Sequence, residues 1–117
     1  MEEREEIGYQ VEITITARLH FYEVAEYLYE NLSLVRAEEV ASSLHEKALS
    51  LNKFFYRGSE ETTLSDRPQG YQYLLFERSK GKYIKIIYYV EKRSKKIYVT
   101  DFFPTEMDDK RIRERNM

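Results

Sequence analysis

Three runs of β-branched and aromatic residues follow one another in the second half of the chain, and they constrain the fold more than any other feature. The runs are Tyr71–Phe76, Tyr83–Val90 and Lys96–Phe103, and two short polar segments separate them. Residues of these types favour strands. Gly81 in the first separating segment suits a hairpin turn, because glycine adopts a positive φ without a steric penalty. Pro104 ends the third run, since proline has no N–H to donate to a neighbouring strand. We therefore expect an antiparallel meander of three strands.

The first half of the chain contains one strand pattern and two helix patterns. Tyr9–Thr16 alternates apolar and polar residues, which is the period of a half-buried strand. From residue 17 to residue 32 apolar residues recur at helical spacing, and Thr16 is placed to cap this helix. A second helical pattern, rich in alanine, covers residues 37–55. Because the joint between the two helices is short, we expect them to pack antiparallel as a hairpin.

These elements together predict an α+β domain with the order β-α-α-β-β-β. The helical hairpin should pack on one face of a small curved antiparallel sheet. A chain of 117 residues suits a single domain over residues 1–117. Within it, residues 57–70 should form a long loop. Residues 1–6 are expected to be a flexible tail, and residues 105–117 either a short helix or a second flexible tail.

The residue types that are missing exclude several classes of site. The chain has no cysteine, which excludes disulfides, thiolate metal sites and cysteine nucleophiles. Its only two histidines are His20, expected at the surface or boundary of the first helix, and His45, expected to be exposed. We therefore expect no metal and no cofactor. No apolar run approaches the roughly 20 residues that span a bilayer, and the acidic N-terminus is unlike a signal peptide. These features predict a cytoplasmic protein with no membrane partner.

Positive charge is concentrated on the meander. Between Glu77 and Lys96 there are eight Lys and Arg residues against two acids, whereas the whole chain has a net charge of −2. A basic sheet end on an acidic body is typical of proteins that face a polyanion or an acidic partner segment. Lysine is also common on exposed strands and turns, where it discourages aggregation. Charge alone favours neither interpretation.

The order of elements and the local sequence together resemble the RelE/ParE superfamily of toxins from type II toxin–antitoxin systems. The matching features are the strand-to-helix entry at residues 13–17, the alanine-rich second helix, the strand at 83–90, and the last strand at 96–103 that leads into a charged tail. They extend over residues 9–112. Family toxins are commonly basic, whereas this chain is acidic overall, and it lacks the C-terminal histidine of some nuclease members.

The resemblance implies a growth-inhibiting toxin, of the kind linked to plasmid stabilization, that a cognate antitoxin neutralises. ParE-like members bind DNA gyrase and carry out no chemistry of their own. RelE-like members are ribosome-dependent endoribonucleases that cut mRNA without a metal, using the 2′-hydroxyl as nucleophile. We rank gyrase inhibition first, because the chain offers no cysteine and no well-placed histidine for proton transfer. RNA cleavage is the alternative, and a non-toxic relative that keeps only antitoxin binding is a third hypothesis.

A nuclease site, if there is one, should lie on the sheet face that the helices leave open. The candidates for phosphate contact are Arg67, Arg78, Lys82 and Lys85. Tyr98 or Tyr89 is the candidate for stacking or proton transfer, and Asp101 or Glu106 is the candidate base. A second set of cations in the last hairpin turn should bind acidic residues of the antitoxin or target: Lys92, Arg93, Lys95 and Lys96.

Overall fold

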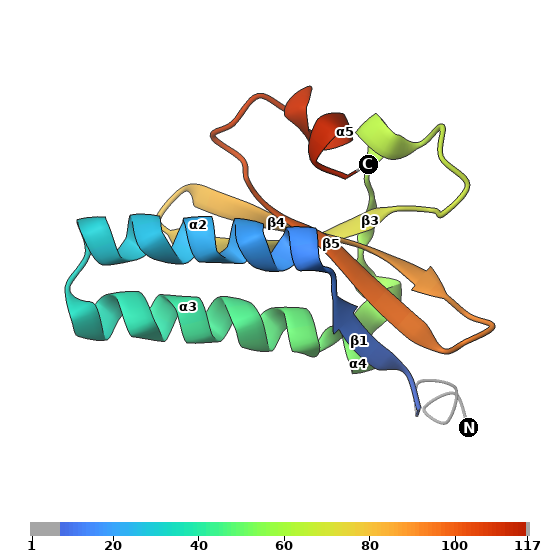
Figure 1. The fold of residues 1–117 in the computed structure, drawn as a ribbon, viewed down its shortest axis with the longest axis horizontal. Helices are drawn as coiled ribbons and strands as arrows, with labels where there is room; N and C mark the ends of the chain where they lie inside the picture. The colour runs from blue at the N-terminus through green and yellow to red at the C-terminus, as the bar shows by residue number, and fades with distance from the viewer. Residues whose placement is uncertain (1–7, 117) are drawn as a thin grey trace.

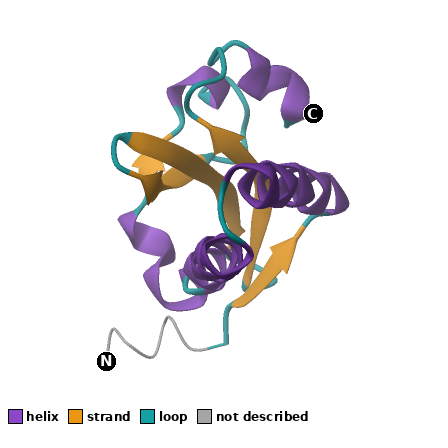
Figure 2. Ribbon diagram, turned by 90° about the vertical axis from the view of Figure 1, so that its left-hand side faces the viewer, coloured by secondary structure: helices purple, strands orange, loops and turns teal. Residues whose placement is uncertain are grey.

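The computed structural model describes residues 8–116, so the expected tail at residues 1–6 lies outside the described residues. Five strands form one sheet in the order β1-β5-β4-β3-β2, and two long helices, α2 and α3, cover one of its faces (Figures 1 and 2). The elements are β1 (Gln10–Ile13), α2 (Ile15–Asn31), α3 (Leu34–Leu49), α4 (Leu51–Phe54), η1 (Phe55–Arg57), β2 (Ser59–Glu60), η2 (Thr62–Leu64), β3 (Gln72–Ser79), β4 (Lys82–Glu91), β5 (Lys96–Pro104) and α5 (Arg111–Arg115). The expected α+β class, and the order of its main elements, are confirmed.

Strands β3, β4 and β5 pair antiparallel as the expected meander, with β4 at the centre of the sheet. The sheet is nevertheless mixed, because β1 pairs parallel with β5 and places Val11 opposite Ile97. The expectation of an antiparallel sheet was therefore wrong for this strand. No tight turn joins β1 to its neighbour, so its direction depends on where the helical hairpin packs.

Strand β5 contains an extra residue at Thr100. Ile87 of β4 lies opposite Asp101, whereas the next residue, Tyr88, lies opposite Val99, which leaves Thr100 without a partner across the strands. Such a bulge bends a strand and redirects its side chains. It lies directly before Asp101, the residue around which the candidate site is built.

Helix α2 begins two residues earlier than the sequence pattern indicated, and Thr14 caps it rather than Thr16. The Thr14 backbone is extended, its N–H donates to the carbonyl of Val99, and its Oγ1 accepts from the N–H of Ala17 at 3.1 Å. Thr14 therefore ends the strand and starts the helix. Thr16 lies exposed inside the first turn.

The second predicted helix, over residues 37–55, is broken at Ser50. Helix α3 is capped by Ser33 and ends at Leu49, and the chain continues as the short α4 and η1. Both the backbone N–H and the hydroxyl of Ser50 bond to carbonyls of the preceding turn. The apolar spacing runs on through Leu51 and Phe55, so periodicity could not reveal this break.

The two faces of the sheet carry separate apolar cores. The larger lies between the sheet and the two long helices, around Leu28, Leu44 and Phe102. The smaller lies on the opposite face, where Ile87 and Phe103 pack against Leu64 and Ile112. The predicted loop at 57–70 thus includes the strand β2 and the helix η2, whose Leu64 is buried. The C-terminal segment forms α5, as the short-helix interpretation expected, and α5 lies beside η2 (Figure 1).

Across residues 8–116, none of the helices combines the length and the apolar character that crossing a membrane requires.

Candidate functional site

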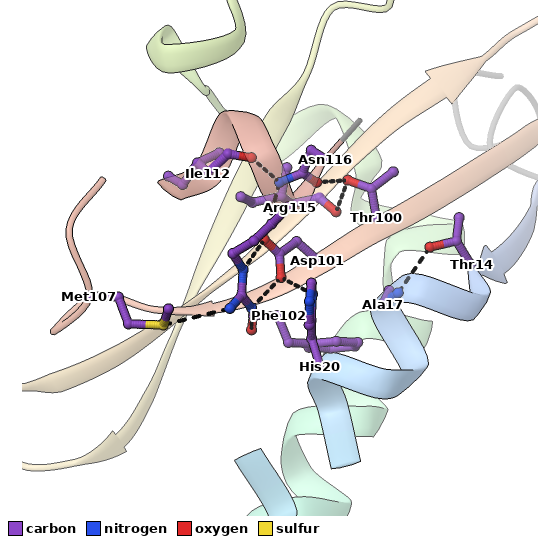
Figure 3. Close-up of polar contacts among 11 residues, drawn as sticks. Thr14, Ala17, His20, Thr100, Asp101, Phe102, Met107, Ile112, Arg115 and Asn116 are labelled. Carbon is purple, nitrogen blue, oxygen red and sulfur yellow. Dashed lines mark hydrogen bonds and ion pairs between the residues drawn. The ribbon is translucent and has the colours of Figure 1, made fainter. Parts of the chain in front are cut away.

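Asp101 is a fully buried carboxylate that gathers side chains from distant parts of the chain (Figure 3). His20 Nδ1 lies 2.8 Å from its Oδ1. Arg115 donates to both carboxylate oxygens, from Nη2 at 2.7 Å and from Nε at 3.0 Å. Asn116 donates from Nδ2 at 3.1 Å. These bonds offset the cost of burying the charge and fix the positions of the groups that surround it.

Three elements position this cluster. The bulge at Thr100 sets the direction of Asp101, and the Thr100 hydroxyl bonds Asn116 at 2.5 Å. His20 comes from the second turn of α2, and Arg115 ends α5. Helix α5 is in turn anchored by the buried Ile112. The pairing of Asp101 with Arg115 therefore ties the C-terminal segment to the sheet and to the long helix.

His20 is the imidazole that the site makes available. Its side chain is only 14% exposed. A carboxylate can only accept, so the His20 Nδ1–H donates to Asp101, and in the neutral form of the imidazole Nε2 then carries a lone pair. Within residues 8–116 no protein group bonds Nε2. An imidazole oriented in this way by a carboxylate is suited to accept a proton.

A groove of about 510 Å³ opens beside His20. It runs between α2, the ends of β4 and β5, and the C-terminal segment. Its lining residues are His20, Glu23, Val24, Tyr27, Arg78, Lys82, Ile84, Phe102, Pro104, Glu106, Met107, Arg111 and Arg115. Four of these are cations and two are carboxylates. Arg78 pairs with Glu106 and Arg115 with Asp101, which leaves Lys82 and Arg111 to attract an anionic ligand. It does not lie on the sheet face opposite the long helices, where the sequence placed the site.

Arg78, a predicted phosphate contact, lies in this groove together with Lys82. Its Nη2 donates to Glu106 at 2.6 Å, and its guanidinium stacks 4.9 Å from the centre of the Tyr27 ring. Glu106 was a candidate base, but it is exposed and paired with Arg78. A phosphate entering the groove would compete with this carboxylate for the guanidinium.

Lys85 lies outside the groove. Its ammonium contacts Glu61 at 2.9 Å and lies 4.5 Å from the centre of the Tyr73 ring. Glu61 is 1% exposed, so this ion pair is an interior contact. The prediction that Lys85 binds phosphate is not supported by this position, since withdrawing it would leave a buried carboxylate unpaired.

Arg67 and the two candidate tyrosines also lie outside the groove and make structural contacts elsewhere. Arg67 donates to the carbonyls of Arg113 and Asn116, and so supports the C-terminal helix. Tyr98 packs against Tyr89 with ring centres 5.2 Å apart, and Tyr89 packs on the smaller core. Burial, chiefly, and the neighbouring tyrosines raise the pKa of Tyr89. None of these three lines the groove.

The second set of predicted binding cations lies in the turn between β4 and β5. Lys92, Arg93 and Lys95 are exposed, and Lys96 lies 3.7 Å from Glu12. This turn is at the opposite end of β4 from the turn that contributes Lys82 to the groove (Figure 1). Antitoxin or target binding there stays a prediction, and it would leave the groove free.

Four of the sequence candidates, Arg78, Lys82, Glu106 and Asp101, lie at or near this groove, although the sequence placed the site on the other face of the sheet. Sequence reasoning missed His20, Arg111 and Arg115. A signal was present for Asp101, because it interrupts an apolar run and a buried acid requires a partner. Nothing local identified that partner, which lies 81 residues away for His20.

No cluster of three or more potential metal ligands occurs among residues 8–116. Comparisons with protein-family models, with curated proteins and with solved structures find no match to this chain.

Proposed function

We propose that this chain is a toxin of the RelE/ParE type that cleaves RNA without a metal, with the reacting phosphate held in the groove. One observation carries the proposal: His20 is oriented by the buried Asp101 at the wall of a groove lined by four cations. The order of elements, on which the resemblance to the superfamily rests, supports the toxin class.

The chemistry requires one proton acceptor and compensation of negative charge. The 2′-oxygen of RNA attacks the adjacent phosphorus, and its proton passes to Nε2 of His20. The bond from phosphorus to the 5′-oxygen breaks, and that oxygen takes a proton from solvent. The products are a 2′,3′-cyclic phosphate and a 5′-hydroxyl, and His20 returns its proton to solvent. Lys82 and Arg111 line the groove, and their charges would offset the charge on the transferring phosphoryl group.

This proposal reverses the ranking that the sequence favoured. Gyrase inhibition was placed first because no histidine could be assigned a position suited to proton transfer. His20 has such a position, next to a buried carboxylate and at the wall of a groove lined by four cations. Inhibition of gyrase stays a prediction, and no feature of the described residues favours it specifically.

The test uses the two histidines as a matched pair. The purified chain is incubated with single-stranded RNA and, separately, with mRNA that ribosomes are translating. We expect cleavage in at least one reaction, with cyclic phosphate ends, and no cleavage where the attacking 2′-hydroxyl is replaced by hydrogen. His20→Ala should lower the rate by about 10² to 10⁴-fold, because it removes the proton acceptor. His45→Ala should leave the rate unchanged, because His45 is exposed and lies outside the groove.

Circular dichroism of both variants controls for folding. The proposal is contradicted if neither RNA is cut, or if His20→Ala inhibits growth as strongly as the unchanged chain at equal expression. A gyrase supercoiling assay on the same preparations then decides whether the first-ranked prediction from sequence is correct.

A further inference from the structure

Helix α2 has a second apolar face, which points away from the sheet. Its residues recur at steps of four and three, and we call this row the α2 stripe: Ile15, Leu19, Tyr22, Glu26 and Tyr29. The four apolar members are 79%, 57%, 63% and 47% exposed, in chain order. Single exposed apolar residues are ordinary on protein surfaces. A row at the 3.5-residue spacing of paired helices indicates a helical partner.

The opposite side of α2 already makes the contacts that the fold needs. Ala17, Val24 and Leu28 are buried against the sheet and α3. The α2 stripe lies on the other side of the helix from these residues. Within residues 8–116 no member of the stripe belongs to either core, and the exposed part of its apolar area is available to a partner.

Two charges, Arg18 beside the stripe and Glu26 within it, favour a second copy of the same helix as the partner. If two copies of α2 pack antiparallel with Tyr22 at the two-fold axis, residues whose numbers add up to 44 face each other. Ile15 then lies opposite Tyr29, and Arg18 lies opposite Glu26. Symmetry forms this ion pair twice. A parallel pair would instead place Glu26 against Glu26.

Neither charge has an ion-pair partner of its own within residues 8–116. Arg18 and Glu26 are eight residues apart, about 12 Å along the helix, so they do not pair within one copy. Antiparallel packing would also align the two helix dipoles favourably. The apolar surface continues sideways into a hollow of about 340 Å³ whose lining includes Phe21, Tyr22 and Leu49.

We propose that the chain forms a symmetric dimer through the α2 stripe, with two antiparallel α2 helices centred on Tyr22. The groove described above lies on the flank of α2 that carries Glu23 and Tyr27, outside the stripe. Both grooves stay open in such a dimer. The proposal therefore does not depend on the proposed function.

The first test measures the oligomeric state of the full chain by sedimentation equilibrium between about 1 and 300 µM, a range that covers ordinary dimer affinities. We expect a concentration-dependent dimer. Leu19→Glu should raise the dissociation constant of the dimer at least tenfold. Tyr56→Glu, at an exposed apolar residue outside α2, should leave it unchanged. If the chain is monomeric throughout the range, the proposal is wrong, and the partner of the stripe would be a different protein. Equal dimer affinities in Leu19→Glu and the unchanged chain overturn it as well.

Charge reversal tests the register. Arg18→Glu alone and Glu26→Arg alone should each weaken the dimer several-fold, because each places like charges together twice. Combining both changes should restore the affinity, since the pairs re-form with opposite sign. If the losses of dimer affinity in the two single variants add up in the double variant, the antiparallel register is wrong.

The absence of cysteine in the chain allows a direct test of the axis. Tyr22→Cys introduces a single thiol next to its symmetry mate and should form an intermolecular disulfide on mild oxidation. Ile15→Cys is the matched control, because the two copies of residue 15 would lie about 21 Å apart along the helices. Equal crosslinking at the two positions, or none at position 22, contradicts an axis at Tyr22.

Discussion

Tyr88 and Gly58 show how one close contact fixes the identity of a residue. Tyr88 is fully buried, and its hydroxyl donates to the carbonyl of Phe55 at 2.6 Å, with Gln72 Oε1 at 2.9 Å. Burial, which disfavours the phenolate, raises its pKa to about 12, so the hydroxyl stays protonated at neutral pH. A Cβ at Gly58 would lie 2.1 Å from this hydroxyl oxygen. The Gly58 φ of −72° suits any residue, so glycine is needed here for space.

We predict that Gly58→Ala lowers the free energy of unfolding by about 1 to 3 kcal/mol, because Tyr88 must move and its hydrogen bond weakens. Urea denaturation measures the change. Ser59→Ala, at the exposed neighbour, is the control and should change little. Adding Tyr88→Phe should relieve only part of the strain, since the new Cβ would still lie 2.8 Å from the ring carbon Cζ. A stable Gly58→Ala variant would show that the ring can shift at no cost.

At the scale of the element, α2 depends on its N-terminal cap. It has no acidic residue in its first turn and no basic residue in its last turn, so no side-chain charge there stabilises the helix dipole. The Thr14 hydroxyl satisfies one of the free N–H groups at the helix start. The same residue pairs with β5 through its own N–H. The position of His20 therefore depends on where Thr14 starts the helix.

We predict that Thr14→Ala destabilises the protein by about 1 kcal/mol, the usual cost of losing such a cap. Thr16→Ala tests the alternative that the sequence pattern favoured. It should be neutral or slightly stabilising, because alanine is the better helix former at an exposed position. Thermal and urea denaturation of both variants measure the difference. An equal loss at both positions would mean that the cap contributes nothing specific.

At the scale of the whole molecule, the Asp101 cluster joins segments that are far apart in the chain. It connects α2, the bulged strand β5 and the C-terminal helix α5, and the same cluster forms one wall of the groove. Folding of the C-terminal segment and assembly of the groove should therefore be coupled. A change that releases Arg115 should affect both.

We predict that Arg115→Met lowers the free energy of unfolding by about 3 to 5 kcal/mol, because it leaves Asp101 buried without its main counter-charge. Arg111→Met is the control: it removes a cation from the groove at an exposed position and should cost little stability. Adding Asp101→Asn to Arg115→Met should recover part of the loss, since the unpaired charge is then gone. If the single variant is as stable as the control, the cluster does not hold the C-terminal segment in place.

The sequence by itself determined the features that depend on neighbours in the chain. The three-strand meander followed from apolar runs joined by short turns, and the helical hairpin followed from 3.6-residue periodicity. Segments joined by a short turn pair with their neighbours in the chain, so the local sequence pattern is enough to predict the pairing. The basic character of the meander and the absence of cysteine were also evident from the sequence.

The tertiary structure decided what depends on contacts between distant residues. It set the direction of β1, gave Lys85 and Arg67 internal partners 24 and 46 residues away, and brought His20 to Asp101 across 81 residues. A charged side chain at the surface and one that pairs with a buried carboxylate look alike in sequence. Which of the two it becomes depends on the carboxylate that folding brings within about 3 Å, and no local pattern specifies that distance.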